Sequence, residues 1–221
     1  MWDTHSVVFY FYISFVMIGL WGVAQAWLSQ TRTETIHPFK AFVHLLVFYL
    51  SYLLFPLFFF SLYAGWSDYY SLHEAVFIFG LSCLLIYARF IEPHHVGVKT
   101  MQYQLNPEQK MQQPIKIALI GDLHIGLFSG HERQLNIIVT KINQQNPDLV
   151  LVAGDWTYEP ENTLADELAV LKQIKAPVYS VNGNHDEQYP GPPIQNLLRH
   201  ALKVNNVIDI EGQMIEFDEF R

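Results

Sequence analysis

The stretch APVYSVNGNHDE, residues 176–187, joins an apolar segment to a group of polar side chains. The apolar part is predicted to form a buried strand, which ends at Gly183 just before Asn184, His185 and Asp186. Asn, Gly and Asp are common in turns because they tolerate positive φ or bond to their own backbone. A polar turn is therefore one interpretation, and a ligand site at a strand end is the other.

Two earlier stretches repeat this arrangement. The strand predicted over 115–122, IKIALIGD, leads into Asp122 and His124. The strand predicted over 147–155, PDLVLVAGD, ends in Asp155. Ligands of open α/β sheets bind outside the carboxyl ends of the strands. The three stretches are therefore expected to bring carboxylate, imidazole and amide groups into one crevice.

Helical patterns separate and follow these strands. Apolar spacing and N-cap residues predict helices over 131–146, 162–174 and 193–202. A fourth strand is predicted over 206–210, and residues 213–217 are a candidate fifth. Strands that alternate with helices indicate right-handed crossovers and a largely parallel sheet. The fold class expected for this half of the chain is α/β.

The first ninety residues have a different character. Three long apolar runs cover residues 7–28, 39–64 and 74–90. A helix needs about 20 mostly apolar residues to cross a bilayer, and the third run is the shortest of the three. We expect a membrane domain over 1–90, a polar linker over 91–114 and a second domain over 115–221.

Positive charges predict the orientation of the membrane domain. No Lys or Arg precedes the first run or lies between the second and the third. Arg32 lies between the first and second runs and Lys40 at the very start of the second, and Lys99 and Lys116 are among those that follow the third. The excess of Lys and Arg in cytoplasmic loops then places everything after the third run in the cytoplasm.

The composition of the chain argues against a nucleic-acid partner and against cysteine-based chemistry. The formal net charge of −8 argues against nucleic acid, because nucleic-acid binders usually carry a basic surface. The single cysteine, Cys83, lies in an apolar run, so no intrachain disulfide or thiolate metal site is expected. Carboxylate, imidazole and amide ligands suit Mn, Fe or Zn. Two such ions about 3.5–4 Å apart can clamp a phosphate and activate water.

The order D-x-H, GD, GNHD at successive strand ends resembles the calcineurin-like metallophosphoesterases, and the apolar runs resemble their membrane-anchored bacterial branch. The resemblance implies a β-sandwich flanked by helices and two divalent metal ions. It implies that Asp122 and His124 bind one metal, that Asp155 bridges both and that Asn184 binds the second. It further implies that His185 contacts phosphate and protonates the leaving group.

The other polar and aromatic residues near these motifs are expected to support the site or to pack beside it. The resemblance implies that Asp186 orients His185 through a hydrogen bond. His200 is the only histidine after His185 and has a helical setting, whereas the family normally supplies a further ligand His and a G-H-x-H motif. We therefore expect a C-terminally truncated phosphoesterase domain that binds at most one metal. Trp156 and Tyr158 are interpreted either as crevice-lining residues or as ordinary packing residues.

These patterns favour a metal-dependent phosphoester hydrolase, anchored in the inner membrane by several passes and facing the cytoplasm. The expected substrate is a phosphodiester or pyrophosphate, and a lipid-linked one fits the tether. The family's lipid A branch makes UDP-diacylglucosamine one candidate. The alternative is a non-catalytic, truncated membrane protein that carries an incomplete metal site.

Overall fold

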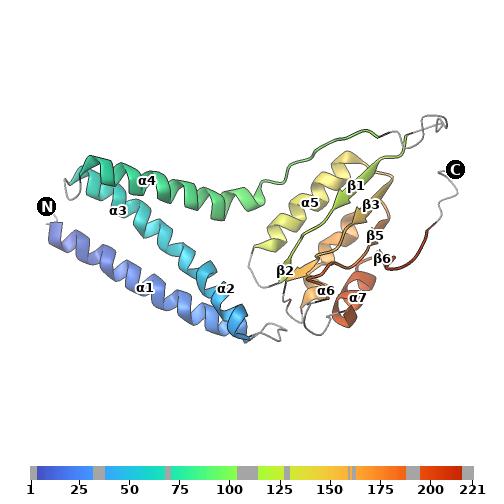
Figure 1. Ribbon diagram of the computed structural model, residues 1–221, viewed down its shortest axis with the longest axis horizontal. Helices are drawn as coiled ribbons and strands as arrows, with labels where there is room; N and C mark the ends of the chain where they lie inside the picture. Colours follow the sequence, from blue (N-terminus) through green and yellow to red (C-terminus); the bar gives the residue numbers. More distant parts are fainter. Residues whose placement is uncertain are drawn as a thin grey trace. The chain divides into compact units, whose positions relative to one another are not determined.

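The computed structural model describes residues 4–31, 38–67, 71–103, 114–126, 130–158, 160, 163–187 and 195–215 (Figure 1). The chain divides into two compact units. One holds the helices that precede Val96, and the other begins at Val96. Each unit is described by itself.

The first unit contains three helical segments that are long and apolar enough to cross a membrane: His5–Gln30, Pro38–Trp66 and Leu72–His94. The first is the single helix α1 (Thr4–Gln30). The second consists of α2 (Pro38–Leu50), a 3₁₀ turn (Ser51–Leu53) and α3 (Leu54–Trp66). The third consists of α4 (Leu72–Ile86), a π-helical segment (Tyr87–Ile91) and a 3₁₀ turn (Glu92–His94). The expected helical character of all three apolar runs is confirmed.

Local chemistry explains where these segments change or begin. Pro56 lies in the first turn of α3 and has no N–H to donate to the preceding turn, so the segment tightens to 3₁₀ geometry at Ser51–Leu53. Helix α4 begins with a capping box, in which the Ser71 side chain accepts from the Glu74 N–H and Glu74 bonds back to the Ser71 N–H. The cap helps to make the third segment 23 residues long, longer than the run expected over 74–90.

The second unit is built on a parallel sheet whose strands lie side by side in the order β1-β3-β5-β6 (Figure 1). The strands are β1 (Ile117–Ile120), β3 (Leu149–Val152), β5 (Val178–Ser180) and β6 (Val207–Asp209). Each falls within a range predicted from the sequence. The intervening helical elements are α5 (His131–Gln145), α6 (Leu164–Glu167), a 3₁₀ segment (Ala169–Gln173) and α7 (Gln195–Val204). The predicted α/β class is confirmed.

The core lies on one face of this sheet. Right-handed crossovers between strands that follow one another in sheet order place every connecting helix on the same side. Accordingly, apolar side chains from the helices and from alternate strand positions form a single buried cluster that includes Leu135, Val150, Leu168 and Leu198. The opposite face is accessible: Leu119 on β1 is 70% exposed.

Two details differ from expectation. The helix predicted over 162–174 changes from α to 3₁₀ geometry at Leu168, and both Leu168 and Leu171 lie in the core. A second parallel ladder joins β2 (Ile125–Gly126) to β4 (Thr157–Tyr158) and was not predicted. In the candidate fifth strand, residues 213–215 are irregular and the remaining two lie outside the described residues.

Candidate metal centre

The loops that follow β1 and β3 run side by side. Ile120 pairs with Val152 in the main sheet, and Ile125 pairs with Thr157 in the small ladder, so the register is the same before and after the loops. Backbone hydrogen bonds continue between the ladders, including one of 3.0 Å from the His124 N–H to the Asp155 carbonyl. The two loops are therefore held together along their length.

Three of the expected ligands adopt left-handed backbone conformations. The φ angles are 55° at Asp122, 47° at His124 and 53° at Asp155. Such conformations cost a non-glycine residue about 1–2 kcal/mol, and they cluster at functional sites. The strand ends are thus bent out of extended geometry at the residues that carry the polar side chains.

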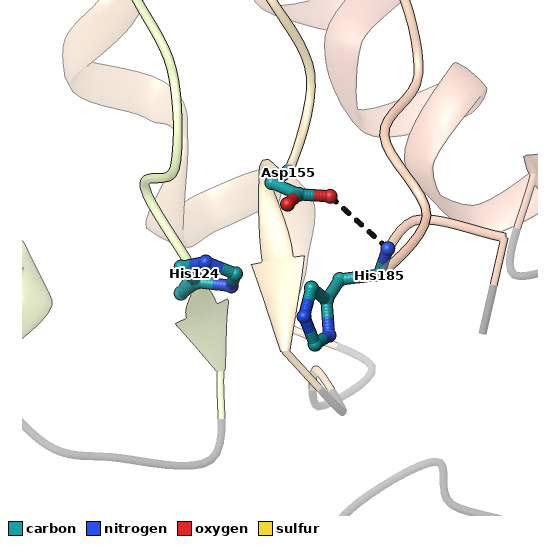
Figure 2. Close-up of side chains that lie close together, drawn as sticks. All are labelled: His124, Asp155 and His185. Atoms are coloured by element: carbon teal, nitrogen blue, oxygen red, sulfur yellow. Dashed lines mark hydrogen bonds between the residues drawn. The ribbon is translucent and has the colours of Figure 1, made fainter. Parts of the chain in front are cut away.

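His124, Asp155 and His185 converge from three strand ends, as Figure 2 shows. Their ligand atoms all lie within 4.8 Å of one another. The two imidazole rings meet edge to face with centroids 4.7 Å apart. The backbone N–H of His185 donates to Oδ1 of Asp155 at 3.0 Å. The expected convergence therefore holds for these three residues.

Two other expected ligands lie at the margin of this group. Asp122 has an 81% exposed side chain, whose Oδ1 lies 3.7 Å from Nε2 of His124. Asn184 is exposed in the turn directly before His185. The imidazole of His185, expected to act on phosphate, lies within 4.8 Å of the ligand atoms of His124 and Asp155, so it is close to any group held there.

The group fits a divalent metal. Nδ1 of His124 is buried and has no hydrogen-bond partner among the described residues. An unpaired buried nitrogen is costly in the absence of a ligand. Imidazole and carboxylate groups are donors that suit first-row metals such as Mn, Fe and Zn.

The two glycines beside Asp155 let the β3 and β5 loops approach closely. Gly154 has φ 87°, and a Cβ there would lie 2.6 Å from the carbonyl carbon of Asn182. A Cβ on Gly183 would lie 2.7 Å from Cγ of Asp155 and closer still to its Oδ1 and N. Neither position has room for a side chain.

Asp186 differs from its expected role. Its fully buried carboxylate accepts hydrogen bonds from the N–H groups of Trp156 (3.2 Å), Thr157 (2.9 Å) and Gly183 (2.9 Å), and from the Thr157 hydroxyl (3.0 Å). None of the bonds found among the described residues joins it to the His185 imidazole. Burial raises the pKa of Asp186, and these hydrogen bonds act in the opposite direction. Asp186 therefore ties the loop after β3 to the turn that carries His185.

The two aromatic residues after Asp155 have different positions. Trp156 is fully buried, and its indole N–H donates to Ser180 Oγ at 2.6 Å, so it is a packing residue. Tyr158 lies against the site, with its ring centroid 5.2 Å from that of His185 and 6.1 Å from that of His124. His200 is exposed on α7, as expected.

Sequence reasoning missed Thr157, which contributes two of the four bonds to Asp186. The only available signal was its position, two residues after the GD pair at the end of β3. Nothing in a single sequence indicates that it faces a residue 29 positions later.

Comparison with known proteins agrees with this geometry. The sequence profile of the calcineurin-like phosphoesterases matches residues 115–216. An uncharacterized metallophosphoesterase of Campylobacter jejuni is 27% identical over 137 residues, which cover 59% of this chain and 36% of that protein. A transmembrane protein with a metallophosphoesterase domain from Danio rerio is 32% identical over 85 residues, which cover 36% of this chain and 19% of that protein.

A third relative, an uncharacterized metallophosphoesterase of Helicobacter pylori, is 31% identical over 91 residues, which cover 40% of this chain and 24% of that protein. The chain thus spans well under half the length of these relatives. No solved structure matches it significantly. The profile match covers all three strand ends, and those ends carry D-x-H, GD and GNHD in order. Residues 115–216 of this chain are therefore similar to the calcineurin-like phosphoesterases over the whole stretch that carries the three strand ends.

Proposed function

We propose that this protein is a membrane-tethered, metal-dependent phosphoester hydrolase. The observation that carries the proposal is the convergence of His124, Asp155 and His185 within 4.8 Å at three strand ends. The family match supports the reaction class. The three apolar helical segments support attachment to a membrane.

The ligand roles follow from position and chemistry. His124 and Asp155 would hold a metal ion, with Asp122 and Asn184 available from the adjacent backbone. A bound Mn, Fe or Zn ion supplies Lewis acidity and lowers the pKa of a coordinated water. The left-handed backbone at Asp122, His124 and Asp155 fixes the direction in which these side chains leave the strands.

His185 is the proposed proton donor to the leaving oxygen. The hydrogen bond from its backbone N–H to Asp155 fixes the position of the residue. The imidazole takes no part in that bond and can transfer a proton. The Tyr158 ring lies beside both imidazoles and would form part of the wall of the site. General acid catalysis of this kind typically contributes about 10²–10⁴-fold.

The proposed substrate is a lipid-linked phosphodiester or pyrophosphate, with UDP-diacylglucosamine as one candidate. A membrane tether confines the enzyme to the plane in which such a substrate is held. The distribution of Lys and Arg favours a cytoplasmic site in the inner membrane. Water-soluble phosphoesters are the competing class, and activity measurements distinguish the two.

The test uses the full chain purified in detergent. Hydrolysis of bis(p-nitrophenyl) phosphate is measured with Mn²⁺ for the wild type, His124→Ala, His185→Ala and the exposed control His200→Ala. We expect His124→Ala to abolish turnover, His185→Ala to lower it about 10²–10⁴-fold and His200→Ala to match the wild type.

Two results would contradict the proposal. Equal turnover in the wild type and His124→Ala would remove the metal centre from the reaction. Bound Mn²⁺ without hydrolysis of any phosphoester would favour a non-catalytic metal-binding protein. A parallel assay with UDP-diacylglucosamine tests the lipid-linked substrate separately.

A further inference from the structure

The third membrane segment changes its helical geometry near its end. Residues Tyr87–Ile91 form a π-helical segment, closed by a hydrogen bond from the Glu92 N–H to the Tyr87 carbonyl. Single π-turns inside α-helices are rare and are frequent at functional sites. Arg89 lies at the centre of this segment, within the 23-residue apolar span.

The Arg89 guanidinium is held by aromatic rings. Its central carbon lies 3.8 Å from the ring centroid of Phe48 on α2 and 4.8 Å from that of Phe90. Phe90 in turn packs on Tyr52 and Phe55, with centroids 5.2 Å and 4.9 Å apart. These contacts connect the second and third segments and fix the cation against the face of Phe48.

Arg89 has no anionic partner in the described part of the chain. A guanidinium carries five N–H donors. None of them forms a hydrogen bond or ion pair with a residue that the structure describes. Glu74 of the same segment is engaged in the helix cap at Ser71, and Glu92 forms no ion pair with Arg89. The guanidinium of Arg89 therefore lies against ring faces, and its donor edge forms no hydrogen bond or ion pair in the described part of the chain.

An ionised side chain inside an apolar span is costly unless it is paired. Stacking on a ring leaves the edges of the guanidinium open, and that planar fork matches a phosphate oxygen pair in a bidentate fashion. Exposed apolar side chains flank the position, including Leu84 (62% exposed) and Ile91 (52% exposed). Such side chains suit contact with acyl chains.

We propose that Arg89, seated on Phe48, binds the phosphate of an anionic membrane lipid. The phosphate would accept from the guanidinium edge while the acyl chains lie along the apolar surface of the third segment. The site is distinct from the metal centre and does not depend on hydrolysis.

The experiment titrates the delipidated full chain in detergent with phosphatidylglycerol and counts bound lipid by native mass spectrometry. We expect wild-type protein to bind one lipid preferentially and Arg89→Gln to bind it about tenfold more weakly, equivalent to about 1.4 kcal/mol. Arg89→Lys keeps the charge but loses the fork, so its affinity should fall between the two. Lys99→Gln, which removes an exposed charge outside the span, should bind as the wild type does.

Three further arms make the test decisive. Phe48→Leu should weaken binding of phosphatidylglycerol because it removes the ring against which the Arg89 guanidinium lies. Diacylglycerol, which has no phosphate, should not bind at the site. Inorganic phosphate should not displace the lipid at equal concentration, and displacement would overturn the assignment to a headgroup. Equal lipid affinity in Arg89→Gln and the wild type, with matching helical circular dichroism, would also overturn the proposal, as would an equal loss in Lys99→Gln.

Discussion

Oδ1 of Asp155 accepts a 3.0 Å hydrogen bond from the backbone N–H of His185. The two residues follow different strands, β3 and β5, which are neighbours in the sheet. One carboxylate oxygen thus fixes the turn that carries His185, while the other remains available to a ligand. The position of the histidine and the ligand capacity of the aspartate are coupled through a single side chain.

Asp155→Asn and Asp155→Ala should distinguish the contribution of Asp155 to metal binding from its hydrogen bond to the His185 backbone. Both remove the negative charge, so we expect both to weaken Mn²⁺ binding by more than the roughly 10–100-fold typical of residues that only support a ligand. Asn keeps an oxygen that can accept from His185, so Asp155→Ala should lower the melting temperature more. Isothermal titration with Mn²⁺ and a thermal melt in detergent measure the two effects. Asp148→Asn, at the opposite end of β3, is the control and should retain Mn²⁺ affinity.

Gly183→Ala should damage the site, whereas Gly121→Ala should be tolerated. The new Cβ at 183 would collide with the backbone and side chain of Asp155. At Gly121 the nearest atom to a new Cβ is Ala153 Cβ at 3.5 Å, an ordinary contact. We expect the first variant to lose Mn²⁺ binding and the second to keep it. The same affinity in both variants would show that the loops relax at little cost.

Asp186→Asn should destabilise the protein although it removes a buried charge. An amide offers one acceptor oxygen, and its NH₂ group cannot accept from the N–H donors that now face the carboxylate. Buried donors left unpaired cost about 1–3 kcal/mol. Thr157→Val, which removes one hydroxyl donor, should have a smaller effect, and Thr157→Ser should be near neutral. Thermal melts in detergent rank the series, and a melting temperature in Asp186→Asn equal to that of the wild type would contradict it.

The pair formed by His131 and Glu167 predicts a pH dependence. Nε2 of His131, at the start of α5, lies 3.2 Å from Oε2 of Glu167. Burial would raise the pKa of Glu167, but hydrogen bonds from His131 and Thr163 and the charge of His131 outweigh it and lower the pKa below 4.5. A carboxyl whose pKa is lowered in the fold contributes stability that is complete above the unfolded pKa and lost as pH falls through the folded one.

The melting temperature of Glu167→Gln should therefore be lower than that of the wild type at pH values above 4.5 at which His131 is protonated. The gap should close as the pH falls below 4.5. Glu132→Gln, an exposed change on the same helix, serves as the control and should show no such convergence. A gap that widens on acidification would contradict the sign of the pKa shift.

The sequence predicted the strands and the convergence of His124, Asp155 and His185 because both depend on local patterns. Buried strands are short apolar runs that break at glycine, and parallel strands end on one edge. It did not predict the β2–β4 ladder, since two residues form a strand only by pairing with a distant partner. It also did not predict the change from α to 3₁₀ geometry at Leu168, because the apolar residues keep a helical spacing through that point.

The position of Asp186 differs from the one that the family resemblance implied. The resemblance implied a hydrogen bond from Asp186 to the neighbouring His185 side chain. In the fold its carboxylate instead lies against Trp156 and Thr157, about thirty residues earlier. Contacts of that separation depend on the tertiary packing of two loops, and no periodicity in one chain encodes them.

The strand order β1-β3-β5-β6 has a consequence for synthesis on the ribosome. Every strand pairs with the one made immediately before it in this sheet, so no strand has to be inserted between two that are already joined. The sheet can grow at one edge as the chain emerges, with each helix packing onto the face already formed. Chains are synthesised from the N-terminus at about 5–20 residues per second, so each strand emerges after its partner in this sheet. The three apolar segments precede the sheet, so they leave the ribosome before any of its strands.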